Sequence, residues 1–219
     1  MELSDLTTDT STRATRGAST GARKGWRITL NAPVVLGFAA LCCVATLLGY
    51  ATGGASDTLL FACYQSSLFD PLTYVRFFTH SLGHSGWEHL AGNMAFILLL
   101  GPLLEEKYGG RALLEVILIT ALACGLVNFV LFPGTAIMGA SGVVFAFILL
   151  ASITDAHEGE IPITFILVAL IFLGQQVYQG VFVADSVSQL SHIIGGVVGA
   201  IIGFGLVGKN LNQPRENAR

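Results

Sequence analysis

Two polar residues in otherwise apolar stretches of the chain could together perform nucleophilic chemistry. Ser141 lies in the segment Gly139-Ala140-Ser141-Gly142, shortly after a Pro-Gly turn signal. A serine hydroxyl is a weak nucleophile at neutral pH unless a neighbouring base takes its proton. His192 could be that base, and the nearest carboxylate in the sequence, Asp185, lies outside its apolar stretch. The residues therefore predict a serine–histidine dyad rather than a triad.

Small residues at helical spacing give a reason for these two positions to meet. They follow His192 at i+3, i+7 and i+11, and they recur four residues apart beside Ser141. Small residues on two facing helices let the backbones approach closely within a membrane. The two sets are Gly142 with Ala146, and Gly195 with Gly199 and Gly203. If these ridges pack together, the imidazole comes to lie next to the hydroxyl.

A second polar pair, His89 and Asn93, is spaced i, i+4. On a helix these side chains lie on one face, one turn apart. Both can donate hydrogen bonds. Polar groups within membrane spans are costly and are functional candidates by default. The alternative is a polar pair that only links two helices.

Metal binding is the main chemical rival. His80, His84, Glu88 and His89 are close in sequence, but there is no HExxH motif, and the His84–His89 segment is one residue too long for HxxEH. The four cysteines show no paired spacing, so they predict neither a disulfide nor a metal cluster. The spacing therefore does not favour a zinc site.

The elements that position these residues are membrane spans. The chain is 53% hydrophobic and only 11% charged, against roughly 25% charged residues in soluble domains. About 20 apolar residues cross a bilayer as a helix, and Phe132-Pro133-Gly134-Thr135 divides the longest charge-free run. The result is an all-α, polytopic protein with six spans, at residues 31–52, 88–105, 112–131, 139–154, 161–181 and 188–207.

The fourth range, 139–154, is short. At 1.5 Å per residue it reaches ~24 Å, below the ~30 Å of the hydrocarbon core. Ser141 would then lie below the membrane surface, where irregular backbone must be buried in protein or line a water-filled cavity. It would also lie near a helix N-terminus, whose free N–H groups favour a developing oxyanion.

The charges orient the spans. With the N-terminus inside, Arg76 is the only one of the eleven Lys and Arg residues on the outer side, as the positive-inside rule predicts. Both termini are therefore expected in the cytoplasm, with flexible tails at 1–27 and 209–219 around a membrane domain at 28–208. The outer loop, 53–86, is rich in aromatic residues and is expected at the membrane interface.

Together these features resemble the rhomboid family of intramembrane serine proteases. The resemblance runs from Arg76 to Gly203, with the motifs in the family's order and spacing. The motifs are Arg76-Phe77-Phe78-Thr79-His80, His84, His89-x3-Asn93, Glu105-Glu106-Lys107-Tyr108-Gly109, Gly139-x-Ser141-Gly142 and His192-x2-Gly195-x3-Gly199.

The resemblance implies catalysis by Ser141 as nucleophile and His192 as general base. His89, Asn93 and the backbone N–H of Ser141 would form the oxyanion hole. His80 and His84 would be the loop and cavity histidines. Structural or packing roles are implied for Gly139, Gly142, Gly195, Gly199, Phe145, Arg76 and Glu105. Many members have Tyr where this chain has Phe145, so stacking on the catalytic His without a hydroxyl is expected.

The family cleaves transmembrane segments of membrane proteins near the outer face, without a cofactor. The expected partners are therefore transmembrane protein substrates and the lipid bilayer, with no nucleic acid and no metal. The expected location is a prokaryotic cell (inner) membrane, as an integral, multi-pass protein. Two rivals are a catalytically inactive relative that binds membrane spans, and a small transporter or channel. The chain has both Ser141 and His192, and shows neither the paired charges within spans nor the inverted repeats of a transporter.

Overall fold

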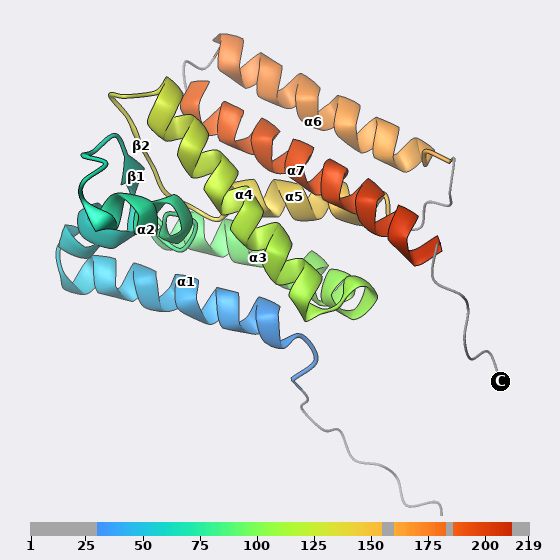
Figure 1. Ribbon diagram of the computed structural model, residues 1–219, viewed down its shortest axis with the longest axis horizontal. Coiled ribbons are helices and arrows are strands. Elements are labelled where there is room, and N and C mark those ends of the chain that lie inside the picture. Colours follow the sequence, from blue (N-terminus) through green and yellow to red (C-terminus); the bar gives the residue numbers. More distant parts are fainter. Residues whose placement is uncertain (1–29, 155–159, 183–185, 212–219) are drawn as a thin grey trace, which may run out of the picture.

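The computed structural model describes residues 30–154, 160–182 and 186–211. The segment 1–27, expected as a tail, lies outside these residues, and so does most of 209–219. The described residues form a bundle of long helices, with short elements gathered at one end of it (Figure 1).

Each of the six ranges predicted as spans overlaps one long or medium helix. They are α1 (Pro33–Ala51), α3 (Trp87–Tyr108), α4 (Gly110–Leu131), α5 (Ser141–Ser152), α6 (Ile163–Phe182) and α7 (Ser186–Leu211). Within the part of the chain that the structure describes, α1, α3 and α4 are long and apolar enough to cross a membrane. The protein is therefore mostly helical and is an integral membrane protein.

The loop at 53–86, called the outer loop after the predicted topology, contains short elements that the expectation of an all-α protein left out. These are a π-helix η1 (Asp57–Phe61), a strand β1 (Cys63–Tyr64) and a helix α2 (Pro71–Thr79). β1 pairs antiparallel with β2 (Ala136–Ile137), with Cys63 opposite Ile137. Two residues per strand are too few to produce an alternating pattern, so the sequence carries no period that could reveal the pair. The ladder ties the outer loop to the segment that precedes α5.

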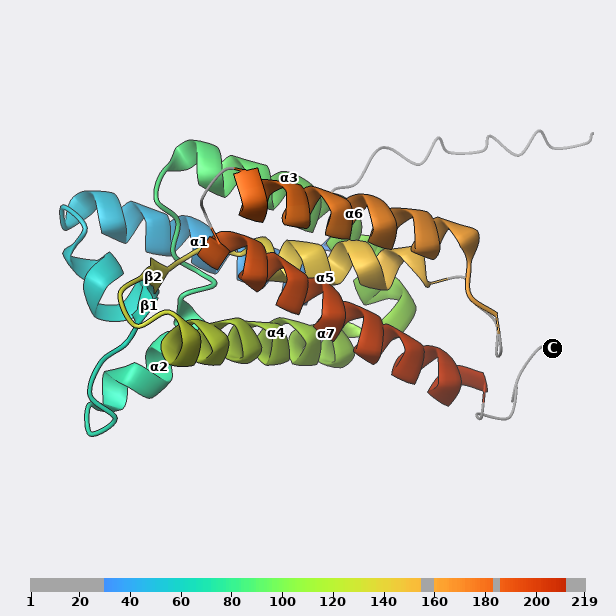
Figure 2. The ribbon, with the colours of Figure 1, turned by 90° about the horizontal axis from the view of Figure 1, so that it is seen from above.

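Helix α5 is the central helix of the bundle. It packs against α3, α4, α6 and α7, and Figure 2 shows it among the other long helices. Val143, Phe147 and Leu150 are fully or almost fully buried on it. Because it is enclosed by protein, α5 can be shorter than a helix that faces lipid along its whole length. The first residue of this central helix is Ser141.

Candidate active site

Ser141 is held at the start of α5 by an unusual backbone turn. Gly139, two residues before it, has φ +130°, a conformation that side-chain-bearing residues rarely adopt. Ala140 is the N-cap residue, so Ser141 occupies the first turn of the helix. The first N–H groups of a helix have no partner within it. The hydroxyl and a set of free backbone donors therefore come from the same turn.

A cavity of about 200 Å³ lies beside Ser141. Its lining includes His89 from α3, Gly139 from the turn, Thr120 and Cys124 from α4, and Ser191 from α7. Polar groups from four parts of the chain thus surround one space. A substrate group or water could be held there within reach of the serine.

His89 and Asn93 approach this space from the first turns of α3. A Cβ placed on Gly139 would lie 2.8 Å from His89 Nε2 and 3.8 Å from Asn93 Nδ2. Ser85 Oγ lies 3.2 Å from the other ring nitrogen, Nδ1. Asn93 is buried, and its Nδ2 has no hydrogen-bond partner among the described residues. Two potential donors therefore lie against the turn that leads into Ser141, and glycine at 139 leaves room for them.

Helix α7 reaches the same end of α5 through glycine. A side chain on Gly195 would collide with the backbone of Gly142, and one on Gly199 with the backbone of Ala146. These are the two ridges of small residues that the sequence singles out. The helices can approach this closely because only glycine and alanine lie at these two contacts.

His192 lies on α7 one turn before Gly195. Its ring lies 4.4 Å, centroid to centroid, from the ring of Phe145, with the planes tilted by 44°. Phe145 is one helical turn after Ser141 on α5, and its other neighbour is Phe172 of α6, at 4.3 Å. The imidazole is therefore held over the face of α5 that carries both Phe145 and Ser141. The structure thus brings together in one region the residues that the sequence proposes as nucleophile, base and hydrogen-bond donors.

Two residues of this region were not predicted from the sequence. Thr120 is fully buried, and its Oγ1 finds no partner in the described part of the chain. Cys124 donates a hydrogen bond to Ser191 O at 3.4 Å. A lone Thr or Cys in an apolar run is an ordinary helix-packing residue, so only the threonine's polarity could have drawn attention to α4.

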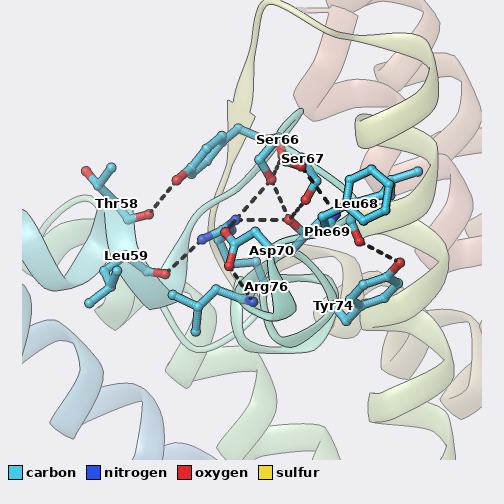
Figure 3. Close-up of polar contacts among 12 residues, drawn as sticks. Thr58, Leu59, Ser66, Ser67, Leu68, Phe69, Asp70, Tyr74 and Arg76 are labelled. Carbon is cyan, nitrogen blue, oxygen red and sulfur yellow. Dashed lines mark hydrogen bonds and ion pairs between the residues drawn. The ribbon is translucent and has the colours of Figure 1, made fainter.

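Arg76 lies outside this cavity and organises the outer loop (Figure 3). Its guanidinium donates to Leu59 O at 3.2 Å and to Asp70 Oδ2 at 2.9 Å, and it lies 4.7 Å above the ring of Tyr64. Asp70 also caps α2 by accepting from Leu72 N. These two hydrogen bonds lower the pKa of Asp70 below its ordinary value. The contacts join η1, β1 and the start of α2.

Glu105 is buried near the end of α3 and caps another helix. Its two carboxylate oxygens accept from Val34 N at 3.0 Å and Val35 N at 2.9 Å, in the first turn of α1. A carboxylate satisfies free N–H groups at a helix N-terminus and interacts favourably with the helix dipole. The contact fixes α1 against α3, at the opposite end of α3 from His89.

The loop histidines bond to the backbone. Nε2 of His80 lies 2.9 Å from Ala121 O, and Nδ1 of His84 lies 3.0 Å from Leu82 O. Burial lowers the pKa of each to about 4, so both are neutral at pH 7. The described residues contain no group of three or more His, Cys, Asp or Glu side chains that could hold a metal ion.

Comparison with known proteins gives consistent matches. The model of the Rhomboid domain family matches residues 71–209. The chain is 26% identical over 166 residues to the Rhomboid protease GlpG of Haemophilus influenzae, covering 74% of this chain and 85% of that protein. It is 31% identical over 158 residues to Rhomboid-related protein 2 of Mus musculus, covering 63% of this chain and 52% of the relative.

A plant protein is also similar. Rhomboid-like protein 11, chloroplastic, of Arabidopsis thaliana is 25% identical over 143 residues, which cover 59% of this chain and 51% of that protein. The chain thus spans about half the length of the plant and mouse relatives. The relatives come from a plant, animals and a bacterium, so they do not favour a prokaryotic cell membrane over other membranes.

Proposed function

The chain belongs to the rhomboid family, and we propose that it is an intramembrane serine protease in which Ser141 and His192 form a catalytic dyad. The observation that carries the proposal is the shared cavity. Ser141 and His89 both line it, and the amide nitrogen of Asn93, which has no partner among the described residues, lies close by. Burying polar side chains in an apolar helix bundle is costly, so gathering them around one cavity indicates that they act on a molecule that enters the cavity.

The proposed reaction is acyl transfer. Ser141 Oγ attacks a peptide carbonyl while His192 takes the hydroxyl proton. His192 then gives that proton to the leaving amine, and water hydrolyses the acyl-enzyme with His192 again acting as base. The ring of Phe145 against His192 would keep the imidazole in one orientation through both steps. No cofactor takes part.

The tetrahedral intermediates need donors aimed at the developing oxyanion. His89, Asn93 and the N–H of Ser141 are proposed for this role. Losing one such donor typically costs ~10²–10³ in rate. A buried donor that has no partner within the described part of the chain, as is true of Asn93 Nδ2, needs little reorganisation when the negative charge forms.

The proposed substrates are transmembrane segments of other proteins, cut near the outer face. The backbone of a helix in lipid is fully hydrogen-bonded, so it must unwind before its carbonyl can reach Ser141. Substrates with a helix-breaking Gly or Pro, and small residues near the outer interface, are therefore expected to be preferred.

The proposed topology has six spans, with the protease domain at 28–208 and tails at 1–27 and 209–219. Four helices pack around α5, which supports counting α5 as a short span in the interior of the bundle. The distribution of Lys and Arg supports cytoplasmic termini. Localisation of a tagged chain identifies the membrane that holds the protein.

The test is release of a reporter. Wild-type and Ser141→Ala proteins are each expressed with a single-span protein that carries a detectable outer domain. Wild type should release this domain, and Ser141→Ala should not. A fluorophosphonate probe should label wild type and leave the variant unlabelled. His192→Ala should abolish both signals.

Two results would count against the proposal. Cleavage by Ser141→Ala would exclude that serine as the nucleophile. Binding of the reporter without any cleavage by wild type would favour an inactive relative that recognises membrane spans. Adding EDTA distinguishes the dyad from a metal-dependent enzyme, because a serine–histidine dyad should keep its activity in the chelator.

A further inference from the structure

His84 makes two hydrogen bonds with opposite chemical requirements. Its Nδ1 lies 3.0 Å from the carbonyl oxygen of Leu82, and its Nε2 lies 3.4 Å from the backbone nitrogen of Ala140. A carbonyl can only accept, so Nδ1 must carry the proton. A backbone N–H can only donate, so Nε2 must offer its lone pair. Only the neutral Nδ1–H tautomer meets both conditions, and the side chain is almost completely buried in this state.

The group held by Nε2 belongs to the turn that presents the serine. Ala140 directly precedes Ser141 and is the N-cap of α5. The preceding N–H, of Gly139, donates to His80 O at 2.8 Å. The segment from His80 to His84 therefore holds two successive backbone N–H groups of this turn. The next N–H along the chain is that of Ser141, the proposed oxyanion donor.

His84 also contacts a second member of the proposed oxyanion hole. Its ring meets the ring of His89 edge to face, with centroids 5.0 Å apart. One buried imidazole thus contacts both the turn before Ser141 and the ring of His89. Neither contact brings it to the reacting atoms themselves, since it does not line the cavity beside Ser141.

We infer that His84 is a positioning residue, whose acceptor nitrogen holds Ala140 so that the N–H of Ser141 and the ring of His89 stay aimed at one oxyanion position. This inference rests on the proposed protease function. In this inference the contribution of His84 to the reaction rate comes from the hydrogen bond between Nε2 and Ala140 N. The reaction therefore needs a hydrogen-bond acceptor at the position of Nε2.

Two variants with an amide side chain at position 84 test the two hydrogen bonds of His84 separately. In His84→Gln the side-chain oxygen can take the place of Nε2 as acceptor for Ala140 N–H. In His84→Asn the shorter amide can keep the donor to Leu82 O, but it leaves Ala140 N–H without an acceptor. Both variants lose the ring and its contact with His89, so the control for these losses is the same in both, and the two differ in one methylene group and in the bond that this length allows.

The measurement is kcat and KM for a transmembrane substrate in liposomes, together with the unfolding midpoint of each protein. His84→Asn should lower kcat about 10–100-fold with KM little changed, because small displacements of reacting groups cost rates of that order. His84→Gln should recover most of the kcat. A role in stability alone would instead lower the midpoints without separating the two variants in kcat.

The outcomes are distinct. Equal kcat in the two variants overturns the inference, and so does loss of the folded state in both, which would assign His84 to stability. A shift in KM alone also overturns it. If wild type shows no Ser141-dependent cleavage, the proposed function itself fails, and that result is visible before any His84 variant is compared.

Discussion

Asn93 has a buried amide nitrogen with no hydrogen-bond partner in the part of the chain that the structure describes. An unsatisfied buried donor costs about 1–3 kcal/mol. Asn128 provides the contrast within the same protein. It is also buried, but its amide donates to Cys63 O at 3.0 Å and thereby holds α4 to β1. The buried amide of Asn93 therefore costs folding free energy, whereas that of Asn128 stabilises the fold.

This contrast predicts a separation of activity from stability. Asn93→Ala should lower kcat by ~10²–10³ while changing the free energy of unfolding by less than ~1 kcal/mol, because no partner is left unsatisfied. Asn128→Ala should do the reverse, with a loss of ~1–3 kcal/mol and only a small change in kcat. Substrate cleavage and denaturant unfolding of both proteins provide the test. Parallel losses of activity and stability in Asn93→Ala would contradict an oxyanion role.

Residue identity alone could predict part of the candidate site, and the catalytic roles of its residues stay predictions. Ser141, His192, His89 and Asn93 stand out because polar groups are rare within apolar stretches, and their spacing places each on a helix face. The role proposed for His84 could not be found this way. Its contacts depend on a turn 56 residues away in sequence, and no local pattern encodes a long-range hydrogen bond.

At the scale of elements, the contact between α5 and α7 decides where the proposed base lies. Gly195 packs directly on the backbone of Gly142. Backbone cannot move aside by a change of rotamer, so any side chain at 195 must displace one helix from the other. For Gly205, on the same helix, no described residue lies within 4 Å of the position where a Cβ would be.

The two glycines therefore make a matched pair. Gly195→Ala should push α7 away from α5, with a loss of ~1–3 kcal/mol from overpacking and a fall in kcat of about 10²-fold from misplacement of His192. Gly205→Ala should leave kcat unchanged and slightly stabilise the helix, since Ala is the better helix former. Kinetics and unfolding midpoints of both variants provide the test. Equal behaviour of the two variants would show that close packing at 195 is not needed.

The helices themselves were predictable because charge-free runs and breaker residues bound them. The short strands β1 and β2 and the π-helix η1 were not, since each has too few residues to show a period. The predicted second and sixth spans end earlier than α3 and α7, which continue to Tyr108 and Leu211. Charged residues at these ends suggested a boundary, but a helix can continue beyond the apolar stretch into the interface.

At the scale of the whole molecule, the outer loop and the bundle act as one unit. His80 bonds Ala121 of α4, and His84 bonds the turn before α5. Both imidazoles are almost fully buried. The free energy of folding therefore depends on keeping these two groups neutral, and stability should depend on pH in a window that their pKa values define.

The direction in which stability changes with pH follows from proton uptake by the folded and unfolded states. Burial lowers the pKa of His80 and His84 to about 4 in the folded protein, whereas the value is about 6.5 in an unfolded chain. Between pH 6.5 and 4 the unfolded state binds protons that the folded state resists, so stability falls as the pH falls. Burial also raises the pKa of Asp57. This carboxyl acts in the opposite sense, whereas Asp70, whose pKa is lowered, acts in the same sense as the two histidines.

Unfolding midpoints of the Ser141→Ala protein should therefore fall between pH 7 and pH 4.5, with self-cleavage excluded by the substitution. A second protein that also carries His80→Gln and His84→Gln should be less stable at pH 7, but its midpoint should vary much less with pH, because neither amide takes up a proton. The difference between the two slopes isolates the histidines from every other titrating group. Equal slopes would mean that the imidazoles are not buried against protonation, and the loop would then not be packed on α4 and α5 as described.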